Sequence, residues 1–175
     1  MIRRVALAVP IVCLVLTSAS AQDKPAWKTF TSKEGRFSVL LPGEPKETKQ
    51  NIGSADKMVI QTQYLIEQGN LGYLVSFQDT PGLEKPEMHA KVLDNGRDGA
   101  VKNLNGKLLS ETKLTLDKKY IGLECLIDVP KFKGLYRLRM FIVGDRLYQL
   151  VVLGPKEVVT SKESDQYLDS FQLTK

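Results

Sequence analysis

The chain has 175 residues, with 25 basic and 20 acidic side chains and a formal net charge of +5 at neutral pH. This excess is too small to indicate nucleic-acid binding. The length fits one domain that buries a sizeable core without disulfides or a structural metal.

The first 21 residues have the pattern of a secretory signal peptide. Arg3 and Arg4 precede an apolar stretch from Val5 to Leu16, and the small residues Ala19-Ser20-Ala21 form a cleavage site. We expect cleavage after Ala21, a single mature domain over residues 22–175, and a periplasmic or extracellular location. Removal of the first 21 residues leaves 23 basic and 20 acidic side chains and a single cysteine. An intrachain disulfide is therefore excluded in the mature chain, and no later segment is long and apolar enough to span a membrane.

The first part of the mature chain predicts strands. Phe37, Val39 and Leu41 alternate with less apolar residues, and the sequence PGEP at 42–45 ends this strand. We interpret PGEP as a turn and not as a phosphate-binding loop, because its two prolines lack N–H donors. Residues 58–66 and 71–77 predict a hairpin in which Ile66 pairs with Leu71. That register places a set of apolar residues on one buried face: Met58, Ile60, Tyr64, Ile66, Leu71, Tyr73, Val75 and Phe77.

The remainder of the chain predicts a helix over 86–104, four strands and a second helix. Gly96 and Gly99 in the first helix suggest close packing against a sheet. The four strands span 107–116, 120–129, 134–143 and 146–154, and Gly144-Asp145 predicts a tight turn between the last two. The final helix, over 161–169, has Thr160 or Ser161 as its cap, and residues 170–173 then close the chain against the core. The sequence therefore predicts an α+β fold, an antiparallel sheet of about seven strands with two flanking helices.

The order of these motifs resembles that of small exported bacterial proteins similar in fold to PsbP and to Mog-type α/β/α sandwiches. The segments that carry the resemblance are EGRFSVLLPGEPKE, LDNGRDGAVKNLNGKLLSE, YRLRMFIVGDRLYQLVVLG and YLDSFQLT. The resemblance implies a PsbP-like sandwich over nearly the whole mature chain. It also implies a non-catalytic, accessory role through binding to other proteins, and it supplies no catalytic, cofactor or metal residue.

Residues that could carry chemistry have structural interpretations. His89 is the single histidine, so a His-x-x-x-His zinc site is excluded, and we interpret it as a surface residue. Cys125 alternates in phase with Leu123 and Ile127, which favours a small buried side chain over a reactive thiol. Glu124 is predicted to face Arg139 across a strand pair and Asp128 to lie diagonal to Arg137, as ordinary stabilising pairs. We predict no catalytic residue, no cofactor and no metal site.

A partner surface is the sharpest functional hypothesis that the sequence allows. Arginine together with exposed aromatic residues is typical of protein contacts. The candidate residues are Lys131, Lys133, Arg137, Arg139, Arg146, Phe141 and Tyr148. The leading interpretation is a non-enzymatic exported adaptor that contacts an unidentified envelope protein. A small-ligand or lipid carrier remains an alternative and requires an apolar cavity of about 300 Å³ or more. A carboxylate-based hydrolase is a third.

Overall fold

The computed structural model describes residues 26–54 and 57–175, so the expected signal peptide and its cleavage site lie outside the described residues. Ten strands and three α-helices follow one another along this part of the chain. They are β1 (Lys28–Ser32), β2 (Phe37–Leu41), β3 (Lys46–Ser54), β4 (Lys57–Gln68), β5 (Leu71–Asp79), α1 (Pro86–Asn103), β6 (Lys107–Leu116), β7 (Tyr120–Val129), the 3-10 turn η1 (Pro130–Phe132), β8 (Gly134–Val143), β9 (Arg146–Gly154), α2 (Lys156–Val159), α3 (Lys162–Asp169) and β10 (Gln172–Leu173). The fold is α+β, as predicted.

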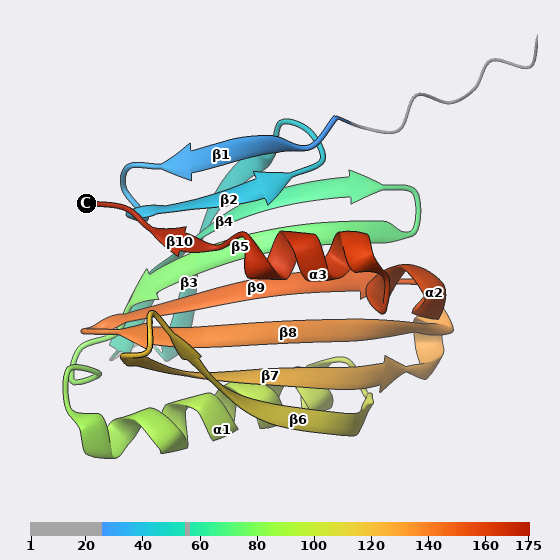
Figure 1. Ribbon diagram of the computed structural model, residues 1–175. Helices are drawn as coiled ribbons and strands as arrows, with labels where there is room; N and C mark the ends of the chain where they lie inside the picture. The colour runs from blue at the N-terminus through green and yellow to red at the C-terminus, as the bar shows by residue number, and fades with distance from the viewer. Residues whose placement is uncertain (1–25, 55–56) are drawn as a thin grey trace, which may run out of the picture.

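The strands form two antiparallel sheets. The larger has seven strands in the order β3-β4-β5-β9-β8-β7-β6, and the smaller has three in the order β1-β2-β10. Figure 1 shows α1 behind β6 and β7, whereas β1, β2, β10 and α3 lie in front of the large sheet. We call the side of the large sheet against which α1 packs the α1 face, and the other side the small-sheet face.

Each face of the large sheet has its own hydrophobic core. On the α1 face, Leu93 of α1 packs among Cys125, Leu138 and Met140. On the small-sheet face, Phe37 and Val39 of β2 pack with residues of β5, β8 and β9 and with α3. The central strands β8 and β9 are therefore covered on both faces, which explains why both carry large apolar side chains.

The second sheet was not predicted. β1 pairs with β2 from Lys28↔Leu41 to Ser32↔Phe37, and β10 at the C-terminus adds to β2 on the other side. We expected residues 170–173 to close against the core, but not to form a strand. The pairing of β10 with β2 joins segments more than 130 residues apart, and two residues of β10 give no local alternation to detect.

The β4–β5 hairpin has a different register from the predicted one. Gln68 pairs with Leu71, so Ile66 lies opposite Tyr73 and not opposite Leu71. The turn is made by Gly69, at φ +63°, and Asn70, and glycine adopts this conformation without steric cost. Because the shift is two residues, Tyr64, Ile66, Tyr73 and Val75 keep the predicted buried face.

Met58 and Ile60 do not share that burial. Their exposed fractions are 64% and 61%. The pairing between β4 and β5 begins at Gln61, so the preceding residues of β4 pair only with β3. The predicted burial of these two residues is wrong because the hairpin extends beyond the strands that form the core.

The predicted registers of the last strands and the predicted cap of the final helix agree with the structure. β7, β8 and β9 have the predicted registers, including Glu124↔Arg139 and Phe141↔Tyr148. The Oγ of Ser161 caps α3 by accepting the backbone N–H of Ser164. Among the described residues, no helix is long and apolar enough to cross a membrane.

Candidate functional site

The structure separates the seven residues of the predicted partner surface. Phe141 and Tyr148 are 4% and 2% exposed and pack around Phe171. They lie on the small-sheet face, which the unpredicted second sheet and α3 cover. The expectation that these two aromatic residues are exposed is therefore wrong.

Arg137 and Arg139 belong to an ionic cluster inside the structure. Glu124 on β7 accepts hydrogen bonds from both guanidinium groups, at 2.9 Å from Arg137 Nε and 2.7 Å from Arg139 Nε. Each arginine also reaches α3, Arg137 to Asp165 at 2.6 Å and Arg139 to Asp169 at 2.8 Å. The cluster links α3 to the large sheet, and the side chains of both arginines are mostly buried.

Arg146 is the first residue of β9 and is 6% exposed. Its guanidinium donates to both carboxylate oxygens of Asp79 and to the carbonyl oxygen of Glu34. The hydrogen bond from Arg146 lowers the pKa of Asp79. Arg146 therefore links β9 to Asp79 of β5 and to the loop that contains Glu34. Its guanidinium group is not available to a partner.

Lys131 and Lys133 are the exposed members of the predicted set. They flank Phe132 in the turn between β7 and β8, and this phenyl side chain is 58% exposed. The Lys131 ammonium lies 5.8 Å from the Phe132 ring centroid. An apolar side chain between two cations thus projects from the end of the sheet, beside a groove.

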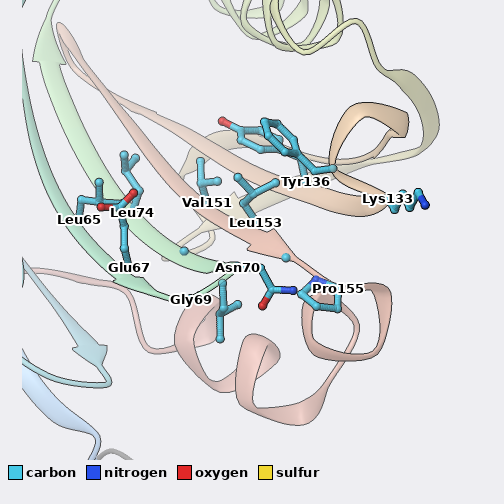
Figure 2. A pocket seen from close by; sticks show the side chains of 14 residues that line it. Leu65, Glu67, Gly69, Asn70, Leu74, Lys133, Tyr136, Val151, Leu153 and Pro155 are labelled. Atoms are coloured by element: carbon cyan, nitrogen blue, oxygen red, sulfur yellow. The ribbon is translucent and has the colours of Figure 1, made fainter.

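The groove is a partly open apolar cavity of about 420 Å³ at this end of the α1 face. We call it the sheet-end groove. Its floor consists of Leu65, Leu74, Val151 and Leu153, from the neighbouring strands β4, β5 and β9. Figure 2 shows these side chains between the Gly69–Asn70 turn and Tyr136. None of the residues that line the groove comes from α1, which packs against β7 and β8.

A glycine helps to make the groove hollow. Gly72 lines it and pairs with Glu67 on one side and with Leu153 on the other. A Cβ atom at this position would have only the carbonyl oxygen of Ile66 nearby, at 3.9 Å. A Cβ atom at position 72 would therefore have space on the groove side of the sheet.

The two sides of the groove carry opposite charges. Glu67 is on β4, beside Leu65 and Leu74, whereas Lys133 is on the side of Tyr136 (Figure 2). Burial raises the pKa of Tyr136 to about 12, so its phenol stays neutral. The groove therefore offers an apolar floor between one carboxylate and one ammonium group.

A row of glutamines continues the same face beyond the groove. Gln61, 7% exposed, donates to the side-chain oxygens of Gln78 and Gln149 at 3.1 Å each. Its own oxygen accepts from Gln50 and Gln63. These amides satisfy one another, so this part of the face is polar.

Comparison with known proteins supports the fold. No protein-family model and no curated protein matches the sequence. Among solved structures, the chain is similar to cyanobacterial PsbP from Synechocystis sp. PCC 6803, with a TM-score of 0.58. The fold is PsbP-like. The match covers 90% of this chain and 98% of that chain at 10% sequence identity, so the likeness concerns the fold alone.

Within this PsbP-like fold, the residues considered for chemistry have structural partners. Cys125 is fully buried, and burial raises the pKa of its thiol to about 11, which confirms the predicted buried side chain. His89 is only partly exposed, and its Nε2 lies 2.8 Å from the carbonyl oxygen of Leu83. Glu124 is bound by two arginines, which counts against its use as a catalytic acid. Residues 26–54 and 57–175 contain no cluster of three or more metal-ligating side chains.

The sequence interpretation missed the sheet-end groove. Its residues come from four strands, two turns and the position after β9, Pro155, and each strand segment alone has an ordinary alternation. Two local signals were present, namely Phe132 between two lysines in a turn and Gly72 inside a strand. Glycine within a strand can mark a close approach of another molecule.

Proposed function

We propose that this protein is a non-enzymatic, exported accessory module that acts by contact with another protein of the cell envelope, and that the sheet-end groove is its contact site. The observation that carries the proposal is the groove itself, an apolar cavity beside the exposed Phe132. Apolar and aromatic residues that are exposed together mark interaction sites in soluble proteins. Export is supported by the signal-peptide pattern of the first 21 residues.

The proposal moves the contact away from the buried arginines. Charge reversal at Arg137 and Arg139 would break the cluster with Glu124, Asp165 and Asp169, so loss of a partner could reflect loss of the fold. The substitution Gly72→Val avoids this problem because it fills the groove from a strand position with space for a side chain. Thr112→Val is a matched control at an exposed position of β6, on the far edge of the sheet.

The test is a capture experiment from envelope extract of the source organism. Residues 22–175 and the two variants serve as bait, and thermal unfolding first establishes that all three are equally folded. We expect a protein that is captured by the natural sequence and by Thr112→Val but is lost with Gly72→Val. A partner retained equally by all three baits would place the contact elsewhere, and the groove would then have no part in it.

A small-ligand carrier is the second candidate, and the volume of the groove favours it. About 420 Å³ exceeds the lower bound of about 300 Å³ for ligand sites. Native mass spectrometry of the purified protein tests this candidate. A bound apolar molecule that disappears in Gly72→Val would support the carrier function, whereas ligand-free protein under gentle ionisation would contradict it.

A further inference from the structure

We propose that the sheet-end groove binds a short extended segment of the partner protein, with apolar side chains in its middle and one acidic and one basic side chain at its two ends. This inference rests on the proposed function, because it names the chemistry of the partner at the same site. The inference is argued from the charges at the groove, in addition to the apolar floor of the groove.

The two charges at the groove are free to bind a partner. Glu67 is exposed on β4, and Lys133 is exposed at the end of the turn before β8. Within residues 26–54 and 57–175, neither forms an ion pair. Two opposite unpaired charges beside an apolar floor complement a segment that carries the reverse pattern.

The spacing of the strands sets the length of the segment. β4 and β8 are separated by β5 and β9 in the sheet, which places them about 14 Å apart at the usual spacing of neighbouring strands. The register places Glu67 level with Tyr136 of β8, and Lys133 precedes Tyr136 by three residues, so the two charged residues are about 17 Å apart. An extended chain advances about 3.3 Å per residue, so about five residues span this distance. The acidic residue therefore lies about five positions from the basic one, with the acid beside Lys133 and the base beside Glu67.

The same charges distinguish a protein segment from an acyl chain. A fatty acid carries a single carboxylate and could satisfy Lys133, but it offers no cation to Glu67. The Glu67 carboxylate would then face the apolar chain across the groove without a counter-charge, which is unfavourable in a partly desolvated site. The observed arrangement therefore favours a segment with both charges.

Peptide display on the purified protein tests the inference. A library of random 12-residue peptides is selected on the natural protein and depleted on Gly72→Val. We expect the enriched peptides to share two or three apolar residues, flanked by an acidic and a basic residue about five positions apart. Synthetic peptides of the enriched sequence should bind Thr112→Val as tightly as the natural protein and should not bind Gly72→Val.

A charge exchange then tests the pattern itself. When the basic residue of the peptide is replaced by an acidic one, affinity for the natural protein should fall about 3- to 10-fold, as expected for exposed ion pairs. The same peptide should regain that affinity on Glu67→Lys. It should not do so on Glu84→Lys, an exposed position outside the groove that gives the same change in net charge.

Two results would overturn the inference. One is that no peptide distinguishes the natural protein from Gly72→Val, and the other is that affinity for the enriched peptides is insensitive to the charge exchange. Neither result would refute the proposed function, because the capture experiment with Gly72→Val reports on whole partner proteins and does not depend on short peptides. Displacement of the enriched peptides by laurate, without dependence on Glu67, would instead support the carrier function.

Discussion

Glu124 is the central acceptor of the ionic cluster that joins α3 to the large sheet. Its two oxygens bind Arg137 and Arg139, and its side chain is only 18% exposed. The aspartates at the other ends of this cluster are half or more exposed. Loss of the Glu124 charge would leave two mostly buried guanidinium groups with only a solvent-exposed partner each.

Glu124→Gln is therefore expected to destabilise the fold. Hydrogen bonds to charged groups contribute about 1.5–3 kcal/mol each. Because Asp165 and Asp169 remain, we expect a loss of about 2 kcal/mol in the free energy of unfolding, measured by urea denaturation. The matched control is Glu111→Gln, which removes the more exposed pair with Arg97 between β6 and α1 and should cost less than about 1 kcal/mol. Equal losses in the two variants would contradict the special role of Glu124.

At the scale of the element, α1 illustrates what its sequence predicts and what it does not. Its range, its start at Pro86 and the burial of Leu93 follow from local patterns. The different roles of its two glycines do not follow from local patterns. A Cβ atom on Gly96 would lie 2.7 Å from the Sδ of Met140, whereas one on Gly99 would meet nothing within 4 Å. The expected close packing is right for Gly96 and wrong for Gly99, because the distinction depends on a side chain of β8.

This difference predicts opposite effects of the same substitution. Gly99→Ala should raise the free energy of unfolding by up to about 1 kcal/mol, since alanine favours the helix and has space there. Gly96→Ala gains the same propensity but pushes against the fully buried Met140, and overpacking costs about 1–3 kcal/mol. Thermal and urea unfolding of the two variants should therefore rank Gly99→Ala above the natural protein and Gly96→Ala below it. The reverse order would mean that α1 does not pack closely on β8.

At the scale of the whole molecule, the sequence predicted the large sheet better than its surroundings. Strands β7, β8 and β9 are long, alternate clearly and are joined by short turns, so local patterns gave their registers. β1 and β3 are short or polar and pair with the next strand along the chain, but they give little apolar alternation, whereas β10 finds its place only through the distant strand β2. The sheet-end groove was missed for another reason. Its strand residues lie on β4, β5, β8 and β9, and the pairing of β5 with β9 joins strands that are far apart in the sequence, so no local pattern indicated that these residues meet.

The two sheets are also joined by specific contacts, which predict how stability changes with pH. Arg146 on β9 binds Asp79 on β5 and the carbonyl oxygen of Glu34, in the loop between β1 and β2. The hydroxyl of Tyr148 donates to the carbonyl oxygen of Gly35, in the same loop. The hydrogen bond from Arg146 lowers the pKa of Asp79 in the folded protein. The Asp79 carboxylate therefore stabilises the fold above the unfolded pKa of about 3.9, and this contribution is lost as the pH falls through the lower, folded value.

The variant Asp79→Asn isolates this contribution. Between pH 5 and pH 8 it should lower the free energy of unfolding by a constant amount of about 1 kcal/mol, a modest value because the Asp79 side chain is 53% exposed. Below about pH 4 the difference from the natural protein should shrink toward zero, because protonation removes the same charge from the natural protein that the substitution removes from the variant. Urea denaturation at a series of pH values measures the difference, with Glu84→Gln as a control that should show no comparable pH dependence. A difference that stayed constant as the pH fell below the unfolded pKa of about 3.9 would show that the substituted amide disturbs the sheet junction by its shape, and that the charge of Asp79 does not stabilise the contact of Arg146 with the loop between β1 and β2.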